Sequence, residues 1–291
     1  MFYLIAAILG SSSLTIILKL FQLKGVDRTV GITVNYIVGA AMAFLFAPKT
    51  VSVAEIVHAP WFPLGMLTGA MFMLSFMVYA LSAQRSGVAV TTISGRAAMA
   101  IPVIFAFAVL GETPTPLKIV LLILLILSMP VILYKRQEPG TTEERSLAWT
   151  AGLPIAVFLF NGTNDTLVQY IQKVQIAARD DNPIFMGSMF VAGAVMGLVY
   201  YLIERRGKWY VPTGRDLLWG AILGATNWVC MIGVLYALTR MDGSIFYALY
   251  YSGAIVCATI VGVWAFREKL SPLNYAGIVV AVAAIVLLSM Q

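Results

Sequence analysis

Apolar segments long enough to cross a lipid bilayer recur along almost the whole chain. A membrane-spanning helix needs about 20 mostly apolar residues, and about ten segments meet that requirement. The expected spans are 2–22, 30–47, 61–84, 87–110, 117–134, 149–175, 183–203, 217–239, 244–266 and 272–290. The sequence therefore predicts an all-α integral membrane fold with about ten transmembrane helices.

The composition leaves no stretch for a soluble domain. Of the 291 residues, 60% are hydrophobic and only 11% are charged, whereas soluble domains are about one quarter charged. The longest polar stretch, 135–146, is expected to be a loop. Residues 1–10 lack a basic region and a cleavage site, so they are expected to be the start of a retained first helix. The net charge of +6 lies on the expected loops, which suits anionic lipid headgroups better than nucleic acid.

Residues that could support catalysis or metal binding are scarce. Cys230 and Cys257 lie in apolar segments, where packing is a better interpretation than a disulfide. The single histidine, His58, lies in an expected loop, so a cluster of His, Cys and carboxylate ligands is not expected. We also find no Ser/His/Asp set and no glycine-rich phosphate loop. The sequence therefore does not favour an enzyme, and no cofactor or metal is expected.

The two halves of the sequence resemble each other. The first half contains Tyr79-Ala80-Leu81-Ser82, Gly87, Gly111-Glu112 and Pro116, and the second contains Tyr236-Ala237-Leu238-Thr239, Gly243, Arg267-Glu268 and Pro272. Each half is expected to contain five helices, and because five is odd, the second half enters the membrane from the side opposite to the first. Inverted repeats of this kind place a substrate site near the midplane of the membrane. We therefore expect two inverted five-helix repeats, 1–146 and 147–291, within one integrated membrane domain.

This series of motifs resembles the EamA-type branch of the drug/metabolite transporter superfamily. The shared features are a third helix that ends at a tyrosine, a short link to the fourth helix and a Gly-Glu pair before the fifth; the same series recurs in the second half, with Arg267-Glu268 in the place of Gly-Glu. The small polar run Asn161-Gly162-Thr163-Asn164 is similar to the start of that family's sixth helix. Residues 11–19 keep the family's lysine, Lys19, but lack its usual tryptophan-glycine pair. The resemblance implies a secondary carrier of small metabolites, often an exporter, in the cell (inner) membrane.

Arg96 and Asp165 are expected near mid-depth in spans from opposite halves. A charged side chain at the centre of a membrane helix costs about 3 kcal/mol on insertion scales, so each needs a partner, a water-filled cavity or, for the carboxylate, a proton. One hypothesis is that Arg96 binds a substrate carboxylate or phosphate in a bidentate manner. A second is that Asp165 binds a substrate amine or carries a coupling proton. The alternative is a structural ion pair between the two residues.

Other polar and aromatic side chains in the spans are further candidates for substrate binding. Asn161, Asn164 and Asp165 share one helix face, and Gly162 is expected to let that helix loosen and free its carbonyls. Hydrogen bonding between helices is the alternative role for the two asparagines. The alternative role for the aromatic candidates is anchoring at the membrane interface. The remaining candidates are Asn35, Tyr36, Tyr79, Trp228, Tyr247, Tyr250 and Tyr251.

Pairs of glycines and one proline predict features of helix packing and helix shape. Gly65 with Gly69, Gly193 with Gly197 and Gly220 with Gly224 have the four-residue spacing that permits close helix contact. Pro102 is expected to kink the fourth span and to act as a hinge.

Together these observations predict a secondary active transporter, an exporter or exchanger, that carries a small polar metabolite by alternating access around a central cavity. An amino acid or related zwitterion fits best, because it presents a carboxylate to Arg96 and an amine to Asp165 or the tyrosines. The alternatives are a lipid or headgroup flippase and an organic-cation or drug exporter. Expected partners are the substrate, membrane lipids and protons as a coupling ion, for a monomer or weak dimer. The resemblance implies cytoplasmic termini, whereas the distribution of Lys and Arg favours the opposite orientation.

Overall fold

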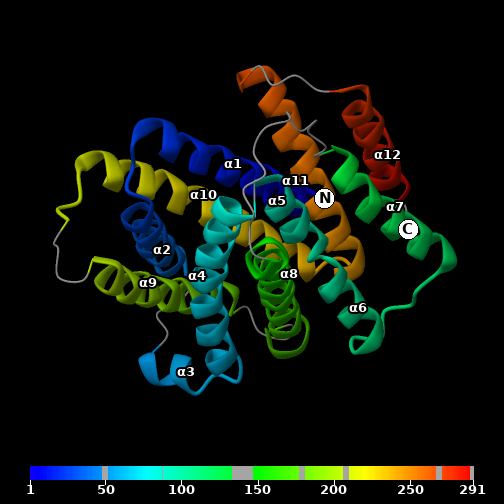
Figure 1. Cartoon of the computed structure of the whole chain (residues 1–291). Coiled ribbons are helices and arrows are strands. Elements are labelled where there is room, and N and C mark those ends of the chain that lie inside the picture. Colours follow the sequence, from blue (N-terminus) through cyan, green and yellow to red (C-terminus); the bar gives the residue numbers. More distant parts are fainter. Residues whose placement is uncertain are drawn as a thin grey trace. The chain divides into compact units, whose positions relative to one another are not determined.

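The structure is a computed structural model that describes residues 1–47, 52–86, 88–132, 147–176, 181–205, 210–266 and 271–288. Within these ranges it is helical and contains no strand. The elements, shown in Figure 1, are α1 (Phe2–Lys24), α2 (Arg28–Leu45), α3 (Val53–Val57), α4 (Phe62–Arg85), α5 (Val88–Ala97), α6 (Ala100–Ala108), α7 (Pro116–Ile132), α8 (Leu147–Tyr170), η1 (Ile171–Ile176), α9 (Asn182–Arg205), α10 (Gly214–Leu238), α11 (Gly243–Phe266) and α12 (Pro272–Leu288).

The all-α membrane fold predicted from the sequence is confirmed. Each expected span contains a helix, and seven segments of the described residues are long and apolar enough to cross a membrane. Helices α7 and α12 are apolar but shorter, so the count of ten spans stays a prediction. The sequence missed α3, which lies in an expected loop and begins with a capping box between Ser52 and Glu55.

Helix starts follow the local chemistry of the sequence. Thr115 accepts a hydrogen bond from the amide of Lys118 (3.2 Å), and α7 begins at the following Pro116. Ser271 accepts one from the amide of Asn274 (3.3 Å), and α12 begins at Pro272. Both helices therefore start with a small polar residue before a proline whose missing amide hydrogen is not needed in the first turn.

Two expected spans are interrupted. The fourth span is divided at Ala98 and Met99 into α5 and α6. Pro102 has no amide hydrogen to donate to the Ala98 carbonyl, which instead accepts from Ile101 at 3.1 Å. This break confirms the expected irregularity near Pro102. In the sixth span, α8 continues into the π-helix η1, a widened form of helix that occurs often at functional sites.

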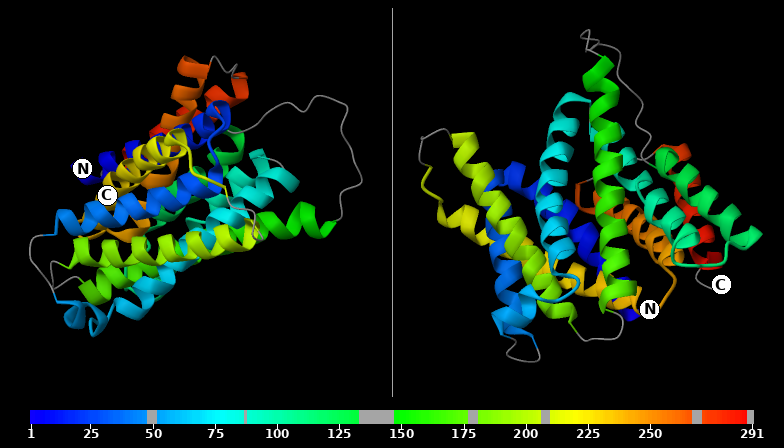
Figure 2. Two further views of the ribbon diagram at one scale, coloured as in Figure 1. Left: turned by 90° about the vertical axis from the view of Figure 1, so that its left-hand side faces the viewer. Right: turned by 90° about the horizontal axis from the view of Figure 1, so that it is seen from below.

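The chain divides into two compact units, each of which combines segments from both halves of the sequence. Unit 1 contains residues 1–74 and 167–240. In it, α2 packs against both α9 and α10, and α10 also packs against α1. Figure 2 shows α2, α9 and α10 running alongside one another. Close contact is achieved at glycines, as predicted: a methyl group at Gly193 would lie 2.5 Å from the ring of Tyr36, and one at Gly224 would lie 2.7 Å from the Asn35 carbonyl oxygen.

Unit 2 contains residues 75–166 and 241–291. Its closest helix pair is α7 with α12, and α11 contacts α6, α7 and α12. The Asn274 amide donates to the carbonyls of Val131 (3.1 Å) and Ile132 (2.9 Å), which ties the start of α12 to the end of α7. A buried Lys118 pairs with Asp242 at 2.9 Å and thereby links α7 to the residue before α11.

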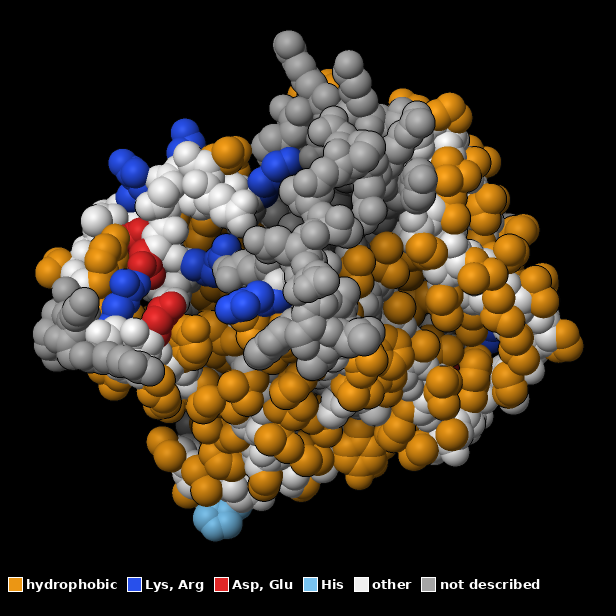
Figure 3. All heavy atoms as spheres, viewed as in Figure 1, with side chains coloured by type: hydrophobic (Ala, Val, Ile, Leu, Met, Phe, Trp, Pro, Cys, Tyr) orange, Lys and Arg blue, Asp and Glu red, His pale blue; other side chains and the backbone are white. Residues whose placement is uncertain are grey.

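Apolar side chains cover much of the surface. Leu45, Trp264 and Val279 are among many exposed large hydrophobic residues. In the view of Figure 3, hydrophobic side chains occupy most of the described surface, whereas Lys, Arg, Asp and Glu side chains gather in one part of it. Such a surface suits contact with lipid chains along the helices.

Candidate functional site

The Asp165 side chain lies in unit 2 and contacts Tyr251, which forms a tyrosine stripe on α11 together with Tyr247 and Tyr250. Its carboxylate accepts a short hydrogen bond from the hydroxyl of Tyr251. One turn earlier on α11, the hydroxyl of Tyr247 donates to the backbone carbonyl of Asp165 at 2.7 Å. Tyr247 is 1% exposed and Tyr251 is 8% exposed, so α11 presents two buried hydroxyls to one residue of α8.

Arg96, near the end of α5, reaches the same tyrosine from another direction. Its guanidinium carbon lies 5.6 Å from the centre of the Tyr251 ring, within the range of a cation–π contact. Among the described residues, no ion pair within 4.0 Å joins Arg96 to Asp165. Tyr251 therefore contacts both charged groups while their opposite charges stay out of direct contact.

Asn161 and Tyr79 approach the helix turn that carries Arg96. A methyl group at Gly95 would lie 3.1 Å from the Asn161 amide nitrogen and 3.2 Å from the Tyr79 ring. Tyr79 also shares a hydrogen bond of 3.0 Å with Thr92, which lies one turn before Arg96 on α5. The absence of a side chain at Gly95 thus lets an amide and a phenol pack beside the arginine.

Asn164 has a different environment from its two neighbours on the predicted helix face. It is 1% exposed, and its amide donates to Ser75 of α4 at 2.7 Å. Its carbonyl oxygen is buried without a hydrogen-bond partner among the described residues. Asn164 therefore links helices, which is the alternative role raised from the sequence, and it retains one free acceptor.

The expectation that α8 loosens at Gly162 is wrong. Helix α8 is continuous through this residue, and Thr166 donates to the Gly162 carbonyl at 2.7 Å. A methyl group at Gly162 would lie 2.3 Å from Ile101, so the glycine permits close approach of α6. The helix widens only at η1, several residues later.

The tyrosine stripe is part of a larger aromatic cluster on α11. Tyr250 stacks on Phe246, with ring centres 5.5 Å apart and planes 11° apart, and it meets Tyr251 edge to face at 5.1 Å. Tyr247 lies 6.5 Å from Tyr251 in a stacked arrangement. These contacts hold the phenol rings in fixed orientations around Asp165.

The other three candidates lie in unit 1. The Asn35 side chain accepts from the amide of Asn227 at 3.1 Å and so connects α2 with α10. Tyr36 is buried against Gly193 and lies 6.0 Å from Phe190, which makes it a packing residue between α2 and α9. Trp228 lies in a pocket with Phe46, with ring centres 5.0 Å apart.

Sequence reasoning missed several residues of the unit 2 site. Thr92 and Ser75 are small polar residues in apolar segments, and their partners, Tyr79 and Asn164, lie in other helices, 13 and 89 residues away along the chain. Phe246 was missed because an apolar ring in a membrane span carries no signal of its own. The i, i+4 spacing of Thr92 and Arg96 on one helix face was the one available clue.

The architecture and the site define a multi-span helical membrane protein with charged groups held among its helices. Residues 148–290 match the model of the EamA-like transporter family. This match confirms the resemblance to the drug/metabolite transporter superfamily, and it indicates a multi-pass membrane transporter of small molecules.

Two further similarities extend over the whole chain. An uncharacterized protein of Haemophilus influenzae is 25% identical, covering 97% of this chain and 95% of its own length. The solved crystal structure of a protein superposes with a TM-score of 0.79 at 15% identity, covering 99% of this chain and 96% of that one. At this identity, the second similarity shows a shared fold.

Proposed function

We propose that the protein is a secondary active transporter of a small zwitterionic metabolite, such as an amino acid, in the inner membrane. The observation that carries the proposal is the placement of Tyr251, which contacts both Arg96 and Asp165 while the two charged groups form no direct ion pair. A substrate with a carboxylate and an amine complements these two groups.

Arg96 is the carboxylate-binding residue in this proposal. No ion pair or side-chain hydrogen bond of Arg96 is found within the described part of the chain, and its guanidinium packs over a ring that leaves its N–H edge available. A guanidinium presents two parallel N–H donors that match the oxygens of a carboxylate. A bound substrate carboxylate compensates the charge of Arg96 inside the protein.

Asp165 is the amine-binding residue, and the α11 tyrosines are the wall beside it. The phenol rings of Tyr250 and Tyr251 supply faces for a cationic group, while Asn161 lies beside the turn that carries Arg96. Asp165 is also the candidate site for a coupling proton, because a carboxylate among helices is favoured when it is protonated or paired.

Alternating access fits the way in which corresponding helices pack. In unit 1, α2 packs against α9, which is the second helix of each repeat. In unit 2, α6, the second part of the fourth span, contacts α11, the fourth span of the second repeat. Also in unit 2, α7 packs against α12, the fifth span of each repeat. Each of these pairs joins the same helix of repeats 1–146 and 147–291. Such pairing is expected for inverted repeats that exchange conformations during transport.

The test is transport by purified protein in liposomes, with labelled amino acids, organic cations and lysolipids as substrates. We expect saturable counterflow of an amino acid that falls at least tenfold in Arg96→Gln and in Asp165→Asn, while both variants stay monodisperse. Wild-type transport by either variant would contradict the role of that residue, and movement of lysolipids alone would favour a flippase.

An organic-cation exporter is the second candidate, because the observed cluster of Phe246, Tyr247, Tyr250 and Tyr251 beside Asp165 suits a planar cation. In the same assay, that function predicts transport of organic cations that requires Asp165 and survives Arg96→Gln. The two variants therefore separate the candidates.

A further inference from the structure

The start of α11 is held by the turn that joins α6 to α7, within unit 2. Glu112, in this turn, accepts hydrogen bonds from the amides of Gly243 (2.6 Å) and Ser244 (3.1 Å) and from the Ser244 hydroxyl. Lys118, in the first turn of α7, pairs with Asp242 at 2.9 Å. These five residues form what we name the α11 clamp. It holds the three consecutive residues at which the helix begins.

Both side chains that α6 and α7 contribute to the clamp are fixed by their own surroundings. Gly111 adopts the left-handed conformation, with φ of 73°, which glycine tolerates without a steric penalty. Glu112 follows it, with its amide bonded to the carbonyl of Ala106 at 3.2 Å. Lys118 is 5% exposed, and its ammonium lies 5.8 Å from the centre of the Phe107 ring. A buried ammonium that lost its anion would be costly, so the ion pair resists movement of α11 away from α7.

The tyrosines of the proposed substrate site follow directly on the same helix. Tyr247 lies about one turn after Gly243, and Tyr251 lies about one turn further. Tyr247 donates to the backbone carbonyl of Asp165 at 2.7 Å, and Tyr251 donates to its carboxylate. Hydroxyl hydrogen bonds need the two oxygens within about 3.0 Å, whereas apolar packing is not directional. The position of α11 along its axis therefore decides whether both bonds form, and the α11 clamp fixes that position.

The two sequence repeats differ at the clamp. At the spacing of the repeat, Lys118 corresponds to Asn274, and Asp242 corresponds to Ser86. The glutamate recurs as Glu268, so the ion pair is the part of the clamp that is particular to α11. Asn274 makes a different contact, because its amide donates to the carbonyls at the end of α7.

The repeats also differ at the tyrosine stripe. The counterparts of the stripe lie in α5 and have no ring: Thr91, Ser94 and Gly95. The charged pair and the tyrosines thus occur on the same helix, and neither occurs at the corresponding positions of the other repeat. This coincidence indicates that the ion pair serves the tyrosines rather than helix packing in general.

We propose that Glu112 and Lys118 are positioning residues of the substrate site. Through the α11 clamp they hold the hydroxyl of Tyr251 at the carboxylate of Asp165, and so they set the orientation in which that carboxylate meets an amine. The effect on substrate binding rests on the proposed transport function, whereas the effect on the bond between Tyr251 and Asp165 does not.

The bond between Tyr251 and Asp165 is tested by thermal unfolding of single and double variants in detergent. Tyr251→Phe, Lys118→Met and their combination are compared with the wild type, and Glu112→Gln is treated in the same way. Methionine retains most of the apolar length of Lys118, and Asp242, whose side chain is 50% exposed, stays hydrated. We expect Tyr251→Phe to lower the melting temperature at most half as much in either clamp variant as in the wild type, because its hydrogen bond is already loosened there. An equal shift in all backgrounds would overturn the proposal.

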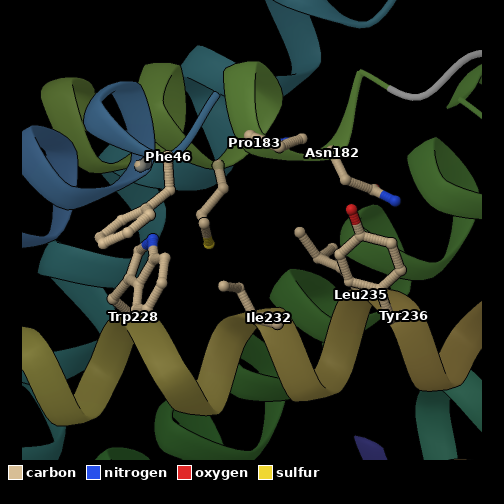
Figure 4. Close-up of a pocket in the computed structure, with 9 residues that line it drawn as sticks. Phe46, Asn182, Pro183, Trp228, Ile232, Leu235 and Tyr236 are labelled. Carbon is tan, nitrogen blue, oxygen red and sulfur yellow. The ribbon is translucent and has the colours of Figure 1, made fainter. Parts of the chain in front are cut away.

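Two controls are matched to the clamp variants. Asn274→Leu removes the counterpart of Lys118 in the other repeat, and Leu235→Ala removes a side chain that lines a pocket of unit 1 (Figure 4). Both changes leave the α11 clamp intact, so the shift caused by Tyr251→Phe should be unchanged in their backgrounds. A shift reduced as much in the controls would show general loosening and would refute the proposal. Ser244→Ala, which removes only the hydroxyl donor to Glu112, keeps the test decisive where a larger change prevents folding.

Counterflow of a labelled amino acid in liposomes tests the consequence for binding. In Lys118→Met we expect KM to rise at least fivefold and the maximal rate to change less than twofold, because the amine-binding carboxylate loses its orientation. A lower rate with an unchanged KM would refute the positioning role in binding. Absence of amino-acid transport by the wild type would refute the proposed function alone, because the unfolding experiment needs no substrate.

Discussion

The hydroxyl of Tyr251 donates a hydrogen bond to the carboxylate of Asp165, and the guanidinium carbon of Arg96 lies 5.6 Å from the centre of the same ring. One residue of α11 thereby contacts an anion on α8 and a cation on α5. This arrangement orients both charged side chains without joining them, which is the property that a site for a zwitterion requires.

The first prediction concerns that hydroxyl. Tyr251→Phe leaves the ring under Arg96 but removes the donor to Asp165, so the carboxylate loses its orientation. We expect transport to fall at least tenfold and the free energy of unfolding to fall by about 1.5–3 kcal/mol, the range for a hydrogen bond to a charged group. Liposome uptake and thermal unfolding of the same preparation measure the two effects.

Tyr247→Phe is the matched control for this prediction. It removes a hydrogen bond of 2.7 Å to the backbone carbonyl of Asp165 and leaves the carboxylate contact intact. We expect a stability loss of about 1 kcal/mol and a much smaller loss of transport. Equal transport defects in the two variants would show that the orientation of the carboxylate is not the important factor.

The second prediction concerns Pro102 and the break between α5 and α6. Pro102→Ala restores an amide hydrogen that can bond the Ala98 carbonyl, so the two helices gain the means to join into one. If movement at this break accompanies transport, kcat falls more than substrate affinity does. Uptake rates and ligand-dependent melting, measured on the same variant, separate turnover from binding.

A proline in an unbroken helix provides the comparison. Pro154 lies inside α8, which continues through it, and Pro154→Ala is expected to leave kcat near the wild-type value. A loss of affinity in Pro102→Ala as large as its loss of turnover would argue against a hinge.

The third prediction concerns Glu112, which lies between α6 and α7 and caps α11. Its carboxylate accepts from the amides of Gly243 (2.6 Å) and Ser244 (3.1 Å) and also from the Ser244 hydroxyl. An anion is stabilised at a helix N-terminus by these amides and by the helix dipole. Glu112→Gln removes the negative charge and places an NH₂ group, a hydrogen-bond donor, against the backbone amides, which are also donors. The free energy of unfolding should therefore fall by about 2 kcal/mol.

Glu55→Gln is the control for the loss of a capping carboxylate. Glu55 accepts from the amide of Ser52 at 2.9 Å in the exposed capping box of α3. Because this box is exposed on a short helix, its loss should change the melting temperature by less than a third of the shift in Glu112→Gln. Similar shifts would mean that Glu112 contributes no more than a surface cap.

The sequence predicted those features of the fold that depend on local pattern. Apolar length located the spans, because a run of about 20 apolar residues is a property of one segment alone. The break at Ala98 follows from Pro102, where the sequence predicted a kink, whereas no local pattern located the π-helix at η1.

The candidate site shows the same division between local and tertiary information. The sequence named Tyr247, Tyr250 and Tyr251 as candidates, but it gave no partner for them. The contact of Tyr251 with both charges depends on how α5, α8 and α11 pack in unit 2. The role of Tyr36 in packing against Gly193 was hidden for the same reason.

The final prediction tests helix packing at Gly69, one of the glycines singled out by spacing. A methyl group there would lie 2.0 Å from the backbone oxygen of Met189 and 2.9 Å from the methyl of Ala192. Backbone cannot rotate away as a side chain can, so Gly69→Ala must push α4 and α9 apart, which lowers the free energy of unfolding by about 3 kcal/mol.

The control is Gly152→Ala in α8, where no atom lies within 4 Å of the added methyl. Helix propensity there predicts that the free energy of unfolding rises by about 0.5 kcal/mol. Thermal unfolding of the two variants should therefore shift in opposite directions, and a Gly69→Ala protein as stable as the wild type would show that α4 and α9 do not approach this closely.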